Sequence, residues 1–176
     1  RQPDDVREFL LRTCVLDRLA GELCDAVTGS AGGRAMLESL ERANLFLVPL
    51  DDRRHWYRYH HLFADVLRAR LLDEDPQLLP ELHRRASDWY DAHQEPSEAI
   101  RHAMAGGQVE RAAELIEVVA PALRQSRQEG TLRRWLEALP NEVFADRPVL
   151  AIALVGARMA TGDTRGVERL LRMVES

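Results

Sequence analysis

Two adjacent histidines carry the most specific candidate chemistry in this sequence. His60 and His61 follow Tyr59 and stand just before an apolar run that begins at Leu62. An imidazole donates a hydrogen bond to a phosphate oxygen and responds when that phosphate is lost, which would suit a sensor of bound nucleotide. On residue chemistry alone, packing in a core or capping the next helix is the simpler role for these side chains.

Two arginines in a charged turn, Arg53 and Arg54, form the second candidate group. Many DNA-binding winged helices insert a basic wing, so these side chains could contact DNA or a neighbouring domain. The helix expected before the turn argues against DNA, because its two glutamates balance its two arginines and carboxylates repel phosphate. Direct contact with DNA stays open as an alternative.

Signatures of other active sites are missing from the sequence. The glycine-rich stretch 29–33 lacks the GK[ST] ending of a phosphate-binding loop, and the chain contains no GxSxG, no HExxH and no lysine. Cys14 and Cys24 have no metal-ligand spacing and lie among apolar residues, where core packing is expected. By itself the chain is therefore expected to hold no metal or cofactor and not to be an enzyme.

The composition is that of an ordinary globular protein. Of the 176 residues, 45% are hydrophobic and 30% are charged, and the formal net charge is -5, which gives no general attraction to nucleic acid or membrane. No apolar run approaches the roughly 18–20 residues of a membrane span. The two cysteines fit a cytoplasmic setting. The first residue, Arg1, and the helical pattern at the end favour a piece of a longer protein.

The pattern around the histidines predicts a winged-helix scaffold. Two short apolar runs, 46–50 and 56–59, flank the charged turn and predict a β-hairpin, the sole strand signal in the chain. Tyr57 and Tyr59 share one face of the second strand, as a half-buried sheet requires. Alternation predicts an inward face on the first strand, formed by Phe46, Val48 and Leu50. The closing helix has predicted inward positions at Leu62, Phe63, Val66, Leu67 and Leu71.

Three helices are expected before the hairpin, because apolar residues recur there at helical spacing. The first begins at Asp4 or Asp5, and the second ends at Gly29, where a glycine favours helix termination. The inward positions predicted for the first helix are Val6, Phe9 and Leu10. Those predicted for the second and third are Leu19, Leu23, Cys24, Val27, Met36, Leu37, Leu40 and Ala43.

A polar break at 73–76 marks the predicted domain boundary. Residues 1–73 would form the winged-helix domain, and residues 74–176 a tetratricopeptide-like helical repeat. Helical hairpins of about 35–45 residues follow one another in the second part, which is typical of stacked repeats. The fold class is therefore predicted to be mostly α, with one β-hairpin in the winged-helix module.

Two details support this prediction for the second part. The segment GGQVERAAELI from Gly106 can be laid over TGDTRGVERLL from Thr161, so that Gly107 aligns with Gly162. The first long helix after the break has a predicted inward stripe at Leu82, Ala86, Trp89, Tyr90 and His93.

The sequence resembles a known family over residues 6–72. The segments FLLRTCVLDRLAGELCDAVTG and MLESLERANLFLVPLDDRRHWYRYHHLFADVLRARL are similar to the MalT-like group of large ATP-binding LuxR-family regulators, which are STAND-class ATPases. The likeness continues more loosely through WYDAHQEPSEAIRHAMAGGQVERAAELIE. It implies a larger cytoplasmic protein with an N-terminal ATPase domain, this winged helix, a superhelical repeat sensor and a C-terminal domain that binds promoter DNA.

The resemblance also implies a role for the histidines. In the wider class, the histidine of a Met-His-Asp motif contacts the β-phosphate of ADP, and Tyr59-His60-His61 is similar to that motif. His60 would then be the nucleotide-sensing residue, with His61 and Arg58 as secondary polar contacts. Tyrosine in place of methionine and histidine in place of aspartate alter its usual polar surroundings. ATP or ADP with Mg²⁺ would belong to the complete protein.

The function expected from this resemblance is regulatory. The winged helix would latch the nucleotide state of the ATPase domain, and the repeats would bind a small-molecule inducer or an inhibitory protein, with no membrane involved. One alternative is the regulatory region of a serine/threonine protein kinase with a MalT-like C-terminal part. The other is a winged helix that binds DNA directly.

Overall fold

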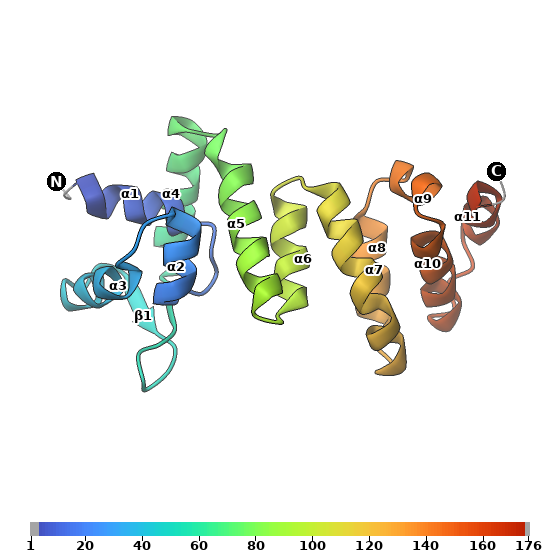
Figure 1. The fold of residues 1–176 in the computed structure, drawn as a ribbon, viewed down its shortest axis with the longest axis horizontal. Coiled ribbons are helices and arrows are strands. Elements are labelled where there is room, and N and C mark those ends of the chain that lie inside the picture. Colours follow the sequence, from blue (N-terminus) through green and yellow to red (C-terminus); the bar gives the residue numbers. More distant parts are fainter. Residues whose placement is uncertain (1–3, 175–176) are drawn as a thin grey trace. The chain divides into compact units, whose positions relative to one another are not determined.

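A computed structural model describes residues 4–174, which divide after Glu95 into two compact units (Figure 1). Helices make up most of both units, and one two-stranded antiparallel sheet lies in the first unit. The predicted fold class, mostly α with one hairpin, is confirmed. Among the helices of residues 4–174, none is long and apolar enough to cross a membrane.

The first unit follows the predicted order of three helices, a hairpin and a closing helix, and it includes one further helix. Its elements are α1 (Asp4–Thr13), α2 (Gly21–Thr28), α3 (Gly33–Arg42), β1 (Leu47–Pro49), β2 (Tyr57–Tyr59), α4 (His61–Glu74) and α5 (Leu78–Ala92).

Two glycines allow α2 and α3 to approach closely at their N-terminal ends. A Cβ atom on Gly21 would lie 2.7 Å from the Cβ atom of Arg34, and one on Gly33 would lie 2.6 Å from the Gly21 carbonyl oxygen. Gly29 ends α2 in a left-handed conformation with φ 75°, as predicted. Ala43 is exposed, and its predicted inward position is wrong because it is the residue that caps the end of α3.

The hairpin buries its second strand, as predicted, but the predicted inward face of its first strand is wrong. The cross-strand pairs are Leu47 with Tyr59, Val48 with Arg58, and Pro49 with Tyr57. Both tyrosines are buried, whereas the predicted residues are exposed by 59% at Phe46, 37% at Val48 and 46% at Leu50. Val48 lies opposite the exposed Arg58, and Leu47, opposite Tyr59, is the one residue of this strand that is partly covered. Phe46 precedes the strand, with a left-handed φ of 54°.

The second strand has a further partner on its other side. The Leu19 N–H donates to the Tyr57 carbonyl oxygen at 2.7 Å, and the Tyr57 N–H donates to the Leu19 carbonyl oxygen at 2.8 Å. Leu19 was predicted to lie in the second helix, which instead begins at Gly21. A single bridge has no alternating pattern, so no periodicity in the sequence could predict it.

The closing helix α4 turns a narrower face inward than predicted. The buried side chains of α4, which packs on α1, are Ala64, Leu67 and Leu71. A helix that buries these three positions leaves Leu62 and Val66 on its opposite face, and each is 63% exposed. The inward prediction is therefore wrong for both. Phe63 lies at the edge and stacks on Phe46, with 5.1 Å between ring centroids.

Helix α5 packs on α2 within the first unit. The Nη1 atom of Arg85 donates to the Val27 carbonyl oxygen at 3.1 Å. Of the predicted inward stripe, Leu82, Ala86 and Tyr90 are buried. His93 is exposed at the C-terminal cap of α5, so its inward prediction is wrong. The domain boundary predicted at 73–76 stays a prediction.

The second unit is entirely helical over its described residues. Its elements are α6 (Pro96–Ala105), α7 (Val109–Gln125), α8 (Glu129–Ala138), α9 (Glu142–Asp146), α10 (Pro148–Ala160) and α11 (Val167–Val174). Neighbours along the chain pack together, α6 on α7, α7 on α8 and α10 on α11, and α8 also packs on α10. Gly107 and Gly162, aligned by the internal match, both adopt a left-handed φ after a helix, at 71° and 75°.

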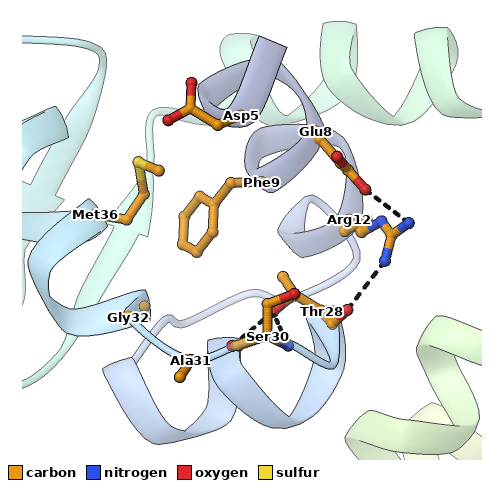
Figure 2. A pocket seen from close by; sticks show the side chains of 10 residues that line it. Asp5, Glu8, Phe9, Arg12, Thr28, Ser30, Ala31, Gly32 and Met36 are labelled. Carbon is orange, nitrogen blue, oxygen red and sulfur yellow. Dashed lines mark hydrogen bonds and ion pairs between the residues drawn. The ribbon is translucent and has the colours of Figure 1, made fainter. Parts of the chain in front are cut away.

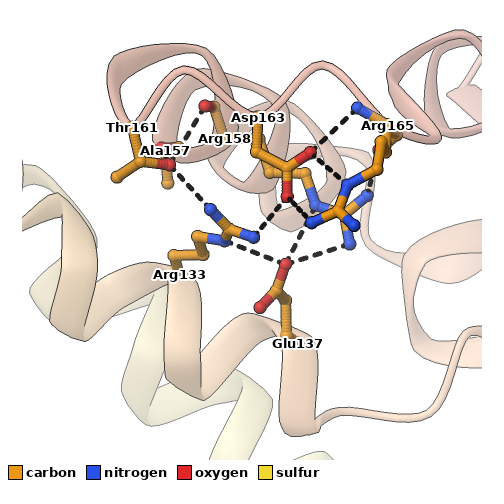
Figure 3. A network of polar contacts seen from close by, with 7 residues as sticks. All are labelled: Arg133, Glu137, Ala157, Arg158, Thr161, Asp163 and Arg165. Carbon is orange, nitrogen blue, oxygen red and sulfur yellow. Dashed lines mark hydrogen bonds and ion pairs between the residues drawn. The ribbon is translucent and has the colours of Figure 1, made fainter.

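Charged side chains join α8 to α10 and to the turn that follows α10. Arg133 Nε donates to Glu137 at 3.0 Å, and its Nη2 donates to Asp163 at 2.5 Å. Arg158 Nε donates to the same Glu137 at 3.1 Å. Arg165 Nε donates to Asp163 at 2.9 Å. Figure 3 shows this arginine network, which consists of Arg133, Glu137, Arg158, Asp163 and Arg165.

Candidate functional site

The two histidines lie where the hairpin passes into the closing helix. His60 is the N-cap residue of α4, and His61 is the first residue of the helix. The His60 N–H donates to the Phe46 carbonyl oxygen at 2.7 Å, which fixes the junction to the first strand. Both side chains are exposed, and the His60 side chain makes no capping hydrogen bond. Neither of the simpler roles, core packing or side-chain capping, is therefore realised at His60.

A pocket of about 470 Å³ opens beside the histidines. The two imidazole rings lie 4.4 Å apart between centroids and are tilted by 31°. Arg58 reaches the same pocket from the second strand, so the structure brings together the predicted sensing residue, His60, and its two predicted secondary contacts. We call this the histidine pocket, and it is lined by Leu16, Asp17, Val48, Arg58, Tyr59, His60, His61, Ala64, Asp65 and Arg68.

The charges in the histidine pocket leave one arginine without an ion pair. Arg68 lies 3.0 Å from Asp17 and 3.6 Å from Asp65, and its Nε donates to the Cys14 carbonyl oxygen at 2.9 Å. Arg58 is exposed and pairs with no carboxylate of the described residues. The pocket therefore offers one uncompensated guanidinium next to two imidazoles, which suits an anionic group.

Tyr59 anchors this pocket to α1. Its hydroxyl donates to Thr13 Oγ1 at 2.7 Å, because Thr13 Oγ1 itself donates to the Phe9 carbonyl oxygen at 2.7 Å. Burial raises the pKa of Tyr59 far above its ordinary value, against the opposing effect of the hydrogen bond with Thr13. Tyr59 is therefore a neutral, fixed side chain directly before His60.

Sequence reasoning did not single out Arg68 or Thr13. The spacing of Asp65 and Arg68, three residues apart on one helix, was a usable local signal for an ion pair. Thr13 and Tyr59 are 46 residues apart, and no local pattern links such distant side chains.

The two arginines of the turn lie outside the histidine pocket. Arg53 and Arg54 are exposed, and Arg54 pairs with Glu41 of α3 at 3.3 Å. Asp51 closes the turn by accepting hydrogen bonds from the N–H groups of His55 and Trp56 at 3.1 and 2.8 Å. These bonds hold the pKa of Asp51 below its ordinary value. Part of the basic charge of the turn is thus balanced by the preceding helix.

A second pocket, of about 220 Å³, lies beside the glycine-rich stretch and is shown in Figure 2. The N–H of Gly33, at the start of α3, already donates to Asp25 Oδ1 at 2.6 Å. Asp5 and Glu8 also line this pocket, and Glu8 pairs with Arg12 at 2.7 Å. The carboxylate of Asp25 at the start of α3, and those of Asp5 and Glu8 in the pocket, would repel a phosphate. The glycine-rich stretch therefore serves as a connection between α2 and α3 in this structure.

The two cysteines have the environment of core residues. Both are buried, and burial raises the pKa of the Cys14 thiol to about 11 although Arg68 acts in the opposite direction. Burial also raises the pKa of Cys24. Neither thiol has the character of an activated nucleophile. Within residues 4–174, no group of three or more His, Cys, Asp or Glu side chains is placed to hold a metal ion.

The sequence was compared with protein families and with known proteins. Residues 1–79 match the MalT winged helix domain. The chain is 37% identical over 178 residues to serine/threonine-protein kinase PknK of Mycobacterium tuberculosis strain H37Rv, a match that covers 97% of this chain and 16% of the kinase.

Transcriptional regulators show a similar degree of likeness. The chain is 37% identical over 146 residues to the HTH-type transcriptional regulator MalT of Klebsiella pneumoniae strain 342, covering 83% of this chain and 16% of the regulator. For MalT of Yersinia enterocolitica the identity is 36% over 172 residues, with 98% and 19% covered. The chain spans less than a fifth of the length of these relatives. Residues 1–79 therefore belong to the MalT winged helix family, and the chain as a whole is similar to the corresponding part of these MalT-like relatives.

Proposed function

We propose that the winged helix domain is a latch that senses the phosphate of a nucleotide held by another domain. The observation that carries this proposal is the exposed pair His60 and His61, 4.4 Å apart, beside an arginine without an ion pair, Arg58. The two imidazoles and the guanidinium would donate hydrogen bonds to phosphate oxygens. Loss of that phosphate would remove the bond that holds the domain closed.

The side chains present fit a phosphate but not a complete nucleotide site. The histidine pocket supplies donors, and its two carboxylates are engaged by Arg68. It has no glycine-rich cradle, and the described residues hold no cluster suited to Mg²⁺. ATP or ADP with Mg²⁺ would therefore be held mainly outside this chain. His60 would bind and orient one phosphate, and the chain itself would not be an enzyme.

The second unit would serve as the input of the same regulator. Its successive helical hairpins resemble tetratricopeptide-like repeats, whose stacked helices provide extended surfaces for ligands. A small-molecule inducer or an inhibitory protein bound there would favour one arrangement of the latch. The complete protein would be cytoplasmic and would bind promoter DNA through a separate C-terminal domain.

The alternative parent is a serine/threonine protein kinase. The observation that favours it is the 37% identity to PknK over 97% of this chain. A kinase would use the same latch and repeats to regulate a different output. The complete reading frame separates these alternatives, because it would encode either kinase catalytic motifs or an ATPase phosphate-binding loop without them.

A direct DNA-binding role has weaker support. Arg53 and Arg54 are exposed in the hairpin turn, but Glu41 of α3 pairs with Arg54. An electrophoretic shift that weakens steeply with salt, and that is lost in the double variant Arg53→Ala/Arg54→Ala, would support this role.

The test of the latch is ADP binding by the full-length protein. His60→Ala is expected to weaken ADP affinity about 10-fold or more, because a hydrogen bond to a charged group is lost, and to raise basal activity. His55→Ala is the matched control, since His55 is an exposed histidine of the hairpin turn that does not line the histidine pocket. Unchanged affinity together with unchanged basal activity in His60→Ala would refute the proposal.

A further inference from the structure

Arg18 lies between the hairpin and α5 and contacts both. Its guanidinium carbon lies 4.5 Å from the ring centroid of Trp56, just before the second strand, and 5.7 Å from that of Tyr90 on α5. It also forms an ion pair with Glu95, just beyond α5. We call this group the Arg18 clasp, and it consists of Arg18, Trp56, Trp89, Tyr90 and Glu95.

The hairpin end of the clasp is fixed by the main chain. Leu19, the next residue after Arg18, forms the double hydrogen bond with Tyr57, the next residue after Trp56. Asp51 accepts a hydrogen bond from the Trp56 N–H at 2.8 Å. A change in the turn would therefore move Trp56 and Arg18 together.

The α5 end of the clasp is fixed by aromatic packing. Trp89 meets Trp56 edge to face, with 6.4 Å between centroids and 81° between planes. Tyr90 is fully buried, and Trp89 also stacks on His93 at 3.7 Å. A guanidinium stacked on aromatic faces keeps a defined orientation, which a flexible ammonium group does not provide.

We propose that the Arg18 clasp couples the hairpin mechanically to α5, so that a displacement of the hairpin reaches α5 through Arg18. The clasp would carry a change in the hairpin to α5, which follows α4 after the short connection at 75–77. The coupling itself needs no nucleotide, so it goes beyond the latch proposed above and can be tested without it.

A competing route also reaches α5. Helix α5 packs on α2, and Arg85 donates to the Val27 carbonyl oxygen at 3.1 Å. If the hairpin acted on α5 through α2, removal of Arg18 would leave the response intact. Arg85→Met is therefore the matched control for Arg18→Met, because it removes an arginine that bridges α5 to α2 instead.

The experiment measures hydrogen exchange in the 176-residue chain after a perturbation in the hairpin. Asp51→Ala removes the acceptor that closes the turn, and exchange at residues 86–92 of α5 is expected to rise about 3- to 10-fold, as in a coupled local opening. In an Arg18→Met background the same substitution is expected to change α5 exchange less than about 2-fold, because the guanidinium bridge is removed and only the edge contact of Trp56 with Trp89 remains. In an Arg85→Met background the response is expected to persist.

Three results would overturn the proposal. They are a full response to Asp51→Ala in Arg18→Met, no response in the otherwise unchanged chain, and loss of the response in both arginine variants. Arg18→Lys repeats the test if Arg18→Met does not fold, since lysine keeps the charge opposite Glu95 but loses the planar stack, and it should also abolish the response. No nucleotide is present, so this result is independent of the ADP measurement.

Discussion

The histidine pocket of the first unit and the arginine network of the second both contain exposed or partly exposed cationic side chains. They differ in whether these side chains are paired with carboxylates. In the network each guanidinium meets a carboxylate of the fold, Arg133 and Arg158 at Glu137, and Arg133 and Arg165 at Asp163 (Figure 3). In the pocket Arg58, His60 and His61 are exposed and pair with no described carboxylate. The fold satisfies the charges of the network, whereas in the pocket it pairs Arg68 with Asp17 and Asp65 but leaves Arg58 and the two histidines available.

This difference separates charges that join helices from charged and polar groups that stay available to a ligand. Charges whose partners lie on neighbouring helices hold those helices together, as α8, α10 and the turn after α10 are held. Donors that stay exposed on a rigid support lose little freedom when an anion arrives. The comparison predicts that stability depends strongly on the support of the pocket, moderately on the network and hardly at all on the exposed donors.

The largest loss of stability is expected at the support of the pocket. Tyr59→Ala removes a buried aromatic ring and should lower the free energy of unfolding by about 3–5 kcal/mol, measured by urea denaturation. Tyr59→Phe keeps the ring and removes the hydrogen bond to Thr13, so a loss of about 1 kcal/mol is expected. Equal effects of the two substitutions would show that the ring itself does not anchor the pocket.

A smaller loss is expected in the arginine network. Hydrogen bonds from the side chain and N–H of Arg165, and from Arg133, hold the pKa of Asp163 well below its ordinary value of 3.8. Asp163→Asn keeps the shape but not the charge, and should lower the midpoint of thermal unfolding by about 2–4 °C at pH 7.

The pH dependence of the stability difference between the original chain and Asp163→Asn is a sharper test of the network. A carboxylate whose pKa is lowered by folding stabilises the protein above its unfolded pKa, and this contribution falls as pH drops below about 3.8. The gap between the original chain and Asp163→Asn should therefore stay constant from pH 5 to 8 and narrow below pH 4. A gap that grows on acidification would contradict this account of the network.

The smallest effect on stability is expected in the histidine pocket. His60→Ala, His61→Ala and Arg58→Met should each change the free energy of unfolding by less than about 0.5 kcal/mol, because these side chains are exposed. The same substitutions should weaken binding of inorganic pyrophosphate, followed by the histidine NMR signals of this chain. A large loss of stability would mean that these residues support the fold, and the contrast with the network would fail.

Local patterns were sufficient for much of the first unit. Apolar spacing predicted the order of helices and hairpin, the alternation of Tyr57 and Tyr59 predicted their burial, and Gly29 predicted the end of a helix. The predicted inward positions of Val48 and Val66 were wrong, since both side chains are exposed. Periodicity gives the spacing of residues on one face of a strand or helix, but it does not say which face packs against the core.

The candidate site was predicted in part. The sequence placed His60 at a strand end before a helix, and the family resemblance drew attention to His61 and Arg58. Three other features depend on residues far apart in the chain, so no local pattern could reveal them. They are the pairing of Arg68 with Asp17, the hydrogen bond between Tyr59 and Thr13, and the position of Arg18 over Trp56 and Tyr90.

The sequence by itself determined the types and order of the elements and the place of the histidines between the hairpin and its closing helix. Local propensity and periodicity act over a few residues, and they were strong there. Only the tertiary structure decided that both histidines are exposed, that Arg58 stays without an ion pair and that Arg68 does not. Those outcomes depend on burial and on partners brought together by folding, because a charge is available to a ligand only where the fold has not already satisfied it.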